Sequence, residues 1–307
     1  MSDRNEIVSR VTAALEGKPA PVAIRNARKV DARGERRGYW VVSDAAGVIV
    51  AAGTGEETFE HYCRTVGLDP ADRNAVIDAE GRILTPGYVD IHAHGAWEKS
   101  FDDGPDGIDV ARAGHAVHGT TRQVLSLITN PVDVICRNIR TVRATMESGR
   151  PDILGCHLEG PFLALARKGA HDPECLKDPV PDIVDKMLEA PVPTPPPASL
   201  AASARSPSPP NCPTHLRHPP VRRCRRGAGR GPLRRRLRDR QSRLRRGRGI
   251  MTHMFNAMNG LHHREPGRVL AAVEDPRVTI ELINDGFHVQ DPMVSLSFRF
   301  APHRTAS

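Results

Sequence analysis

The sequence predicts an α/β protein in which a small N-terminal β-unit precedes a succession of parallel strands and helices. Two observations predict this fold class. Residues 21–85 contain short β-branched runs separated by turn residues, and from Pro86 onward strand-like runs alternate with helical ones. Alternation of this kind favours a parallel sheet, whose functional site lies at the carboxyl ends of the strands. With 307 residues the chain is long enough for one barrel-sized domain.

The first 85 residues are expected to form the β-unit. The runs PVAIRNARKV, GYWVVSDAAGVIVAAG and AVIDAEGRIL are rich in β-branched residues and are punctuated by glycine, aspartate or asparagine. A unit of this size cannot close a large core alone. The N-terminus MSDRNEIVSRVTAALEGK mixes both signs of charge and lacks an apolar region, so no secretory signal is expected.

Residues 86–190 and 250–307 are expected to supply the alternating strands and helices. YVDIHAH and TRQVLSLIT are predicted strands. Asn130 and Pro131 are expected to provide the N-cap and the first-turn proline of a helix over 132–148. The runs ILGCHLEG, IMTHMF and VTIELIND are predicted as further strands.

The segment 191–249 fits no part of this pattern and is expected to be disordered. Its first half is rich in proline, alanine and serine, and the stretch from Arg217 to Arg248 contains 15 arginines and one acidic residue, Asp239. That stretch alone carries +14, so a formal net charge of +8 leaves −6 for the rest of the chain. The composition suggests GC-rich DNA translated out of frame. We hypothesise that the frame is restored near Ile250 and shifts again near Pro302.

The cysteine and hydropathy patterns predict a reduced, cytoplasmic protein. The six cysteines form no CxxC pair and no disulfide framework. No stretch approaches the 18 apolar residues that a membrane-spanning helix needs, so no membrane partner is expected.

Histidine and glutamate side chains stand where predicted strands end. His92 and His94 are two residues apart at the end of one strand, so they project to the same side, and imidazole suits zinc, iron, nickel or copper. Glu159 ends another strand, where it could bind a metal, act as a base or face solvent. His253 ends a third strand, and His171 lies in a loop where it could polarise a carbonyl group. These groups converge if the barrel prediction is correct.

Five motifs follow one another along the chain: PGYVDIHAHG, HLEGPFL, KGAH, THMFNAMNGLHHREPG and NDGFHV. In this order they resemble N-acetylglucosamine-6-phosphate deacetylases of the amidohydrolase superfamily, over roughly residues 21–190 and 250–300. The resemblance implies an incomplete metal-dependent (β/α)8, TIM-like barrel with a small β-sandwich. It also implies removal of the acetyl group from N-acetyl-D-glucosamine 6-phosphate, which gives D-glucosamine 6-phosphate and acetate, by a homodimer.

The resemblance makes Glu159 and His253 metal ligands and assigns His92 and His94 to a second metal position, for one or two divalent ions such as zinc or iron. It makes His171 the residue that orients or polarises the acetamide carbonyl. The positions that it implies for substrate binding are Ala170, Asn256, Ala257, Asp285, Gly286, Phe287, His288 and, at the phosphate, Arg264. A guanidinium suits that last role because its planar fork pairs with phosphate oxygens.

Two residues of the family pattern have no counterpart in the sequence. A further metal-binding histidine is expected where the arginine-rich segment stands, and neither His215 nor His218 fits that position. The catalytic aspartate is expected after one more helix and strand, beyond Ser307. Loss of a general base costs about 10²–10⁴-fold in rate. The deacetylase activity is therefore expected to be impaired.

Three alternatives follow from these departures. The chain could be an inactive, truncated relative of the deacetylases. It could be a dihydroorotase- or hydantoinase-like enzyme, although such enzymes use a modified lysine where this chain has Glu159. It could also be a protein whose arginine run binds nucleic acid or another anionic polymer. That run lacks interleaved aromatic residues, so no specific nucleic acid is expected as a partner.

Overall fold

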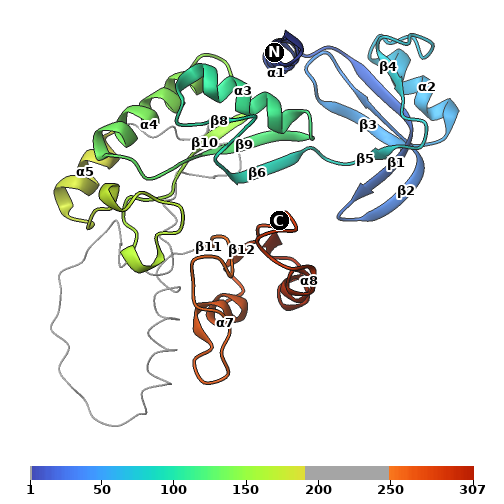
Figure 1. Ribbon diagram of the computed structural model, residues 1–307. Coiled ribbons are helices and arrows are strands. Elements are labelled where there is room, and N and C mark those ends of the chain that lie inside the picture. Colours follow the sequence, from blue (N-terminus) through green and yellow to red (C-terminus); the bar gives the residue numbers. More distant parts are fainter. Residues whose placement is uncertain (1, 191–248) are drawn as a thin grey trace. The chain divides into compact units, whose positions relative to one another are not determined.

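The computed structural model describes residues 2–190 and 249–307 (Figure 1). The disorder and the frame shift predicted for the arginine-rich segment therefore concern residues that lie outside the described ones, apart from Gly249. The chain divides into two compact units. The first comprises Met1–Asp90, Asp109–Gln123 and Gly149–Ile153, and the second comprises Ile91–Ile108, Val124–Ser148 and Leu154–Ser307. The domain boundaries expected from the sequence stay predictions.

Helices and strands alternate along the described chain, as the sequence predicts for an α/β protein. The helices are α1 (Ser2–Glu16), α2 (Glu56–Thr65), α3 (Gly104–Ala116), α4 (Val132–Glu147), α5 (Pro181–Glu189), α7 (Gly267–Glu274), α8 (Asp291–Phe300) and the single turns η1 (Leu165–Arg167) and η2 (Pro173–Cys175). The strands are β1 (Val22–Asp31), β2 (Gly34–Ser43), β3 (Ile49–Thr54), β4 (Val76–Asp78), β5 (Ile83–Leu84), β6 (Tyr88–Ala93), β7 (Gly95–Ala96), β8 (Lys99–Ser100), β9 (Thr120–Leu127), β10 (Ile153–Leu158), β11 (Ile250–Met251), β12 (Thr279–Glu281) and β13 (Thr305–Ala306).

The β-unit expected at the N-terminus is a five-stranded sheet in the order β3-β2-β1-β4, with β5 also paired to β1. β1, β2 and β3 are antiparallel neighbours, whereas β4 and β5 run parallel to β1. Helix α2, which the sequence did not lead us to expect, lies against this sheet (Figure 1). It buries Phe59 and Cys63, which are four residues apart on one helical face. The Phe59 ring lies 6.0 Å from the ring of Trp40 in the core of the unit.

A buried arginine organises the helical part of the first unit. Arg112 of α3 has no exposed surface, and it donates from Nε and Nη2 to both carboxylate oxygens of Asp152, at 2.8 and 2.5 Å. Its Nη1 donates to Asp109 at 2.6 Å. Arg150 donates twice to Asp109, at 2.8 and 2.7 Å, and lies 3.3 Å from Glu16 at the end of α1. Charge-assisted hydrogen bonds thus join α1, α3 and the residues before β10. We call these five residues the Arg112 network.

Strands β6, β9 and β10 begin in the first unit and end in the second, and they form one sheet in the order β10-β9-β6. The N–H of Gln123 donates to the carbonyl of Asp152 at 2.8 Å, and the N–H of Glu159 donates to the carbonyl of Leu127 at 3.0 Å. Because these bonds advance together along both chains, β9 and β10 are parallel. The prediction of parallel strands is confirmed for this pair, and the sheet brings its carboxyl ends to one edge.

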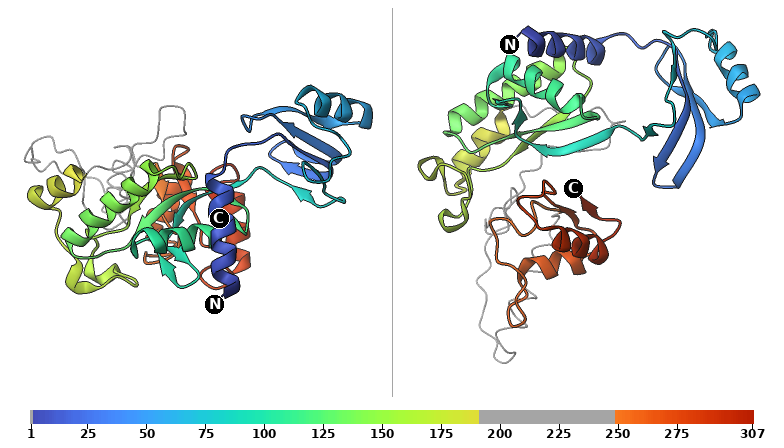
Figure 2. Two further views of the ribbon diagram at one scale, coloured as in Figure 1. Left: turned by 90° about the horizontal axis from the view of Figure 1, so that it is seen from above. Right: turned by 45° about the vertical axis from the view of Figure 1, so that its right-hand side comes forward.

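Helix α4 follows β9 and buries a stripe of apolar residues that includes Ile135, Ile139 and Val142. It begins at Val132, as predicted, but its N-cap is Pro131, without a side-chain cap, and not Asn130. The amide nitrogen of Asn130 faces Asp102 at 3.4 Å. Helix α5 lies beside α4 (Figure 2), and Lys186 of α5 pairs with Asp133 of α4.

Residues 249–307 form a second short sheet of parallel strands, β11-β12-β13, accompanied by α7 and α8 (Figures 1 and 2). Met251, Met254 and Ile280 belong to its apolar core. Arg304 donates to four backbone carbonyls at the end of α7 and just beyond, at 2.7–3.3 Å. The arginine thereby satisfies carbonyl groups that a helix end leaves unpaired.

The strands predicted from IMTHMF and VTIELIND are much shorter than expected, since β11 contains two residues and β12 three. The structure therefore supports a mixed α/β fold with two three-stranded sheets beyond the N-terminal unit, parallel in β11-β12-β13 and in the β9–β10 pair. Closure of a complete barrel, and a second layer for an N-terminal sandwich, stay predictions. Among the described residues, no helix is both long and apolar enough to span a membrane. The four cysteines in this part of the chain are free thiols.

Candidate metal centre

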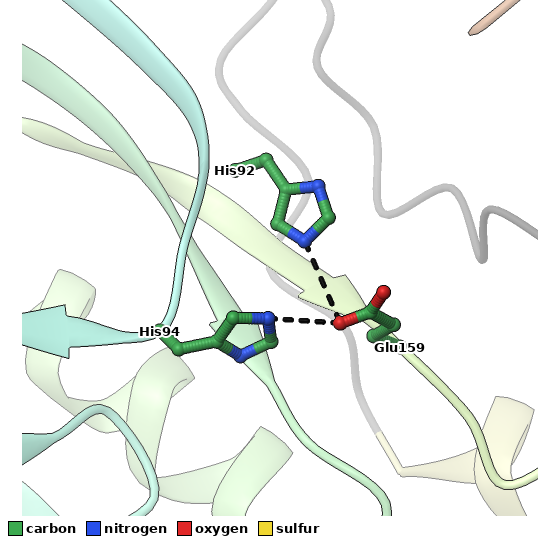
Figure 3. Close-up of side chains that lie close together, drawn as sticks. All are labelled: His92, His94 and Glu159. Carbon is green, nitrogen blue, oxygen red and sulfur yellow. Dashed lines mark hydrogen bonds and ion pairs between the residues drawn. The ribbon is translucent and has the colours of Figure 1, made fainter. Parts of the chain in front are cut away.

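The histidines and the glutamate expected at strand ends do meet, in the second unit. His92 lies in β6, and His94 follows that strand. Glu159 comes directly after β10, where its N–H is tied to Leu127 of β9. Figure 3 shows that His92 and His94 point at the same carboxylate oxygen of Glu159. These three residues offer ligand atoms that all lie within 4.8 Å of one another.

Glu159 is the centre of the arrangement and is 9% exposed. Its Oε2 lies 2.8 Å from Nε2 of His94, 3.6 Å from Nε2 of His92 and 3.8 Å from Nε2 of His171. Its Oε1 lies 3.1 Å from Nε2 of His253. All four imidazoles therefore present the same nitrogen to one carboxylate. We call Glu159 and these four residues the histidine cluster.

The charges of the cluster are strongly coupled. Burial by itself raises the pKa of Glu159, but hydrogen bonds to His253, His92 and His94 outweigh that effect and hold the pKa far below the usual range. Burial likewise lowers the pKa of His92, yet its hydrogen bonds to Glu159 and to Glu281 prevail and raise its pKa to about 9. The carboxylate is thus ionised at neutral pH, and its charge favours the protonated form of His92.

Two buried nitrogens of the cluster lack a partner among the described residues. Nδ1 of His94 and Nδ1 of His253 have no hydrogen bond within 2–190 and 249–307. Unpaired buried polar atoms are costly and commonly mark an ion or water site. Two or three imidazole nitrogens with one carboxylate oxygen form the donor set that zinc and similar divalent ions prefer. The side chains present therefore fit a metal ion.

His253 reaches the cluster from a strained turn, and this corrects its predicted place at the end of a strand. It lies two residues beyond β11 because its backbone leaves the extended conformation, with φ at +35°. Phe255 and Ala257 also have positive φ, at +79° and +51°. Each non-glycine residue in such a conformation costs about 1–3 kcal/mol, and strain of this size is common at functional sites. The N–H of Met254 donates to the carbonyl of Glu281 at 2.8 Å and so fixes the turn to β12.

His171 is buried behind Glu159 and is held by a threonine. Its Nδ1 lies 2.7 Å from Oγ1 of Thr129, and the same hydroxyl lies 3.1 Å from the backbone carbonyl of Glu159. Burial lowers the pKa of His171, so its ring is neutral at pH 7. Thr129 also limits its neighbour Gly160, where an added Cβ would lie 1.8 Å from Oγ1 and where φ is +107°. Glycine is required at this close approach.

Two further buried side chains join the site and were not expected from the sequence. His157 packs edge-on against His92, with ring centroids 4.3 Å apart, and its Nδ1 lies 3.2 Å from Oγ of Ser126. Glu281 ends β12 and lies 3.1 Å from Nδ1 of His92. Both carried a signal in the sequence: His157 is two residues before Glu159, near the end of a predicted strand, and Glu281 is a charged residue inside the apolar run VTIELI.

The other residues expected at a substrate site lie in loops. Ala170 and Ala257 are exposed, and the Asn256 amide is 3.5 Å from the carbonyl of Met254. Arg264 is exposed in the loop before α7. The loop after β12 is ordered by Asp285, whose carboxylate accepts the N–H groups of Phe287 and His288, both at 2.9 Å, and pairs with Nδ1 of His288 at 2.7 Å. Gly286 of this loop has φ at +74°. The substrate roles of all eight residues stay predictions.

Comparison with curated proteins identifies relatives of one kind. The chain is 30% identical over 225 residues to the N-acetylgalactosamine-6-phosphate deacetylase of Escherichia coli O157:H7, a match that covers 72% of this chain and 58% of the relative. It is 27% identical over 241 residues to the N-acetylglucosamine-6-phosphate deacetylase of Danio rerio, covering 74% and 57%. The chain thus spans little more than half the length of these relatives. No family model matches the chain.

Comparison with solved structures identifies enzymes of the same kind. The N-acetyl-D-glucosamine-6-phosphate deacetylase of Mycobacterium smegmatis superposes with a TM-score of 0.68 at 26% identity, covering 93% of this chain and 75% of the other. A mutant of that enzyme in complex with N-acetyl-D-glucosamine-6-phosphate superposes with a TM-score of 0.66, also at 26% identity, covering 94% and 70%. In sequence and in fold, therefore, the chain is similar to N-acetylglucosamine-6-phosphate deacetylases.

Proposed function

We propose that this chain is a metal-dependent deacetylase of N-acetyl-D-glucosamine 6-phosphate, which yields D-glucosamine 6-phosphate and acetate. The observation that carries the proposal is the convergence of Nε2 of His92, His94 and His253 on the carboxylate of Glu159, at 2.8–3.6 Å. The names of the relatives and of the solved structures supply the substrate class. The solved complex of the related mycobacterial enzyme with the same sugar phosphate further supports that choice.

The histidine cluster would hold the metal. Oε2 of Glu159 faces His92 and His94, and Oε1 faces His253, so the two carboxylate oxygens serve two separate groups of imidazoles. This division suits one ion or a pair of ions that share the glutamate, with zinc or iron as the candidates. Such an ion supplies Lewis acidity toward the acetamide carbonyl and activates water for hydrolysis.

His171 would orient the acetamide carbonyl. A neutral imidazole can donate from Nε2 when its Nδ1 accepts a hydrogen bond. The Thr129 hydroxyl lies 2.7 Å from Nδ1 and has a single hydrogen, which it can direct to Nδ1 or to the carbonyl of Glu159 at 3.1 Å. If it turns to Nδ1, Nε2 of His171 carries the hydrogen and would donate to the substrate oxygen; if it donates to the Glu159 carbonyl, Nδ1 carries the hydrogen. The direction of the Thr129 hydroxyl would therefore decide which nitrogen of His171 can donate.

The loop residues would hold the rest of the substrate. Arg264 would pair with the phosphate, with Ala170, Asn256 and Ala257 against the sugar and Asp285–His288 along the pocket. An exposed guanidinium is available at residue 264, and the Asp285 carboxylate already orders its own loop through two backbone N–H groups. A homodimer and a cytoplasmic location remain predictions from the sequence.

A second candidate substrate is N-acetylgalactosamine 6-phosphate, the epimer at C4. The observation in its favour is the 30% identity to a deacetylase named for that sugar. Both epimers present the same acetamide and the same phosphate, so the histidine cluster and Arg264 would serve either. Discrimination would fall to the loop residues that contact the sugar ring.

Acetate release from both epimers, by the purified chain supplied with Zn²⁺ or Fe²⁺, tests the proposal. Release that requires the metal and disappears after chelation supports it. A parallel chimera, in which the corresponding segment of a relative replaces 191–249 and extends the chain past 307, tests the predicted impairment. We expect the chimera to be about 10²–10⁴-fold faster, the usual contribution of a general base. If neither protein releases acetate from either sugar, the assigned function is wrong.

A further inference from the structure

We propose that Glu281 is a positioning residue that fixes the ring of His92 as a metal ligand. The inference rests on the proposed metal-dependent function and assigns a role to a residue outside the motifs that indicated that function. Its basis is the bridging position of one imidazole. Nε2 of His92 faces Glu159 at 3.6 Å, while Nδ1 faces Glu281 at 3.1 Å.

The placement of hydrogen on the His92 ring determines what the contact with Glu281 does. A carboxylate can only accept a hydrogen bond, so Nδ1 of His92 must carry a hydrogen when it bonds to Glu281. In the metal-bound form the ring is a neutral imidazole with a single hydrogen, which the contact with Glu281 keeps on Nδ1, so that Nε2 offers its lone pair to the ion. That lone pair faces Glu159 and the converging nitrogens of the cluster. Glu281 thus selects the tautomer in which His92 can bind a metal through Nε2, and it increases the basicity of that nitrogen.

The surroundings make Glu281 a rigid support. The residue is 8% exposed and ends β12, the central strand of the β11-β12-β13 sheet. Its backbone pairs with Ala306 of β13, and its carbonyl accepts the N–H of Met254 at 2.8 Å. The ring of His157 also packs edge-on against His92, with ring centroids 4.3 Å apart and an interplanar angle of 75°. Both the position and the rotation of the His92 ring are therefore restrained.

His92 differs in this respect from His94 and His253. Nδ1 of His94 and Nδ1 of His253 have no hydrogen-bond partner in the described part of the chain. Of these three histidines, only His92 has a carboxylate within hydrogen-bond distance of Nδ1 in residues 2–190 and 249–307. Outer partners of this kind typically contribute about 10–100-fold to metal affinity.

The experiment measures Zn²⁺ affinity of the full chain by competition with a chromophoric chelator, after the protein has been stripped of metal. Glu281→Leu removes the acceptor, whereas Glu281→Gln keeps an amide oxygen that can still accept from Nδ1. We expect Leu to weaken binding by about 10–100-fold and Gln to weaken it distinctly less. The exposed Glu274→Gln variant in α7 is the matched control and should bind as the wild type does. The absorption bands of bound Co²⁺ should shift in the Leu variant, which loss of stability alone does not cause.

A second measurement tests whether Glu281 acts through His92. In a His92→Ala background, Glu281→Leu should cause no further loss of Zn²⁺ affinity, because the ring that it positions is absent. Equal losses with Leu and Gln, or a full additional loss in the His92→Ala background, would overturn the role. Unchanged Zn²⁺ affinity in the Glu281→Leu variant would overturn the positioning role of Glu281 and leave the proposed metal site unaffected. If the wild-type chain binds no Zn²⁺ and no Co²⁺, the proposed metal function fails together with it.

Discussion

Two clusters of buried charge, the Arg112 network of the first unit and the histidine cluster of the second, use their hydrogen bonds in opposite ways. In the network, two guanidinium groups meet three carboxylates, and each of the contacts between Arg112 and Asp152 joins a donor to an acceptor at 2.5–2.8 Å. In the cluster, four imidazoles turn the same nitrogen toward the single carboxylate of Glu159. Two of their outer nitrogens have no partner among the described residues.

The difference separates a structural site from a ligand site. In the Arg112 network each guanidinium donates to carboxylates of the same unit, so folding alone explains the arrangement. In the histidine cluster, four Nε2 atoms converge on one carboxylate, and two buried Nδ1 atoms have no partner among the described residues. A cation shared by these side chains would explain both observations. Burial and shifted pKa values occur in both clusters and do not by themselves distinguish them.

The largest effect is expected from a substitution in the Arg112 network. Arg112→Met would leave the carboxylate of Asp152, which is 2% exposed, buried without its partner. We expect the free energy of unfolding, measured with urea, to fall by about 3–5 kcal/mol. The double variant Arg112→Met/Asp152→Leu should recover most of this loss because no lone charge remains buried. A loss below about 1 kcal/mol in the single variant, the value of an exposed ion pair, would show that the network is not a structural unit.

The second largest effect is expected from a substitution in the histidine cluster. Glu159→Gln removes the charge on which the imidazoles converge, and we expect Zn²⁺ affinity to fall by more than the roughly 100-fold upper value for an outer-sphere partner. Thermal shift checks the same point, since saturating Zn²⁺ should raise the melting temperature of the wild type and leave that of the variant unchanged. Glu274→Gln, an exposed carboxylate in α7, serves as the control. Equal Zn²⁺ stabilisation of the wild type and of Glu159→Gln would exclude the cluster as the metal site.

A smaller effect concerns the threonine that holds His171. Thr129→Val keeps the shape but removes the hydroxyl from both Nδ1 of His171 and the carbonyl of Glu159, and we expect stability to fall by about 0.5–1.5 kcal/mol. The ¹⁵N chemical shifts of the His171 ring should change as its tautomer is released, whereas Thr129→Ser should preserve them. Identical ring shifts in the Val variant would mean that another group sets the tautomer.

The smallest effect is expected in the pH dependence of stability, at Asp109 of the Arg112 network. Partial burial disfavours the charged form of Asp109, but hydrogen bonds from Arg150 and Arg112 prevail and lower its pKa below the usual value of 3.8. A carboxyl group whose folded-state pKa is depressed contributes stability above its unfolded pKa and loses that contribution as pH falls through the folded value. Urea unfolding at about pH 6 and at about pH 3.5, just below the ordinary pKa of an aspartate, should therefore show a smaller acid loss for Asp109→Asn than for the wild type. An equal loss in both would mean that Asp109 has an ordinary pKa.

Much of the site could be predicted because its residues follow strand rules. His92 and His94 alternate along one strand, and Glu159 ends another, so parallel pairing brings them to one edge without any knowledge of the loops. The motif order then indicated the family, which the comparisons support. Helix α4 was predicted from the Asn130-Pro131 start signal and does begin at Val132, but Pro131 and not Asn130 is its N-cap.

The rest depends on contacts that sequence spacing does not reveal. Glu281 lies 189 residues from His92, so only the folded chain shows that their side chains meet. The strand expected at IMTHMF ends early because His253 takes a left-handed backbone conformation, which β-branched and apolar periodicity does not report. Helix α2 was missed because its buried face comprises only Phe59 and Cys63, too few residues to establish a helical period.

The close approach of Gly160 to Thr129 has a consequence for how this sequence can vary. A Cβ at residue 160 would overlap the threonine hydroxyl, so the tolerance of one position depends on the other. Substitutions there should behave epistatically: alanine at 160 should be better accepted after Thr129→Gly than in the wild type, with the left-handed φ as the remaining penalty. Among relatives of this chain, the two positions are therefore expected to co-vary.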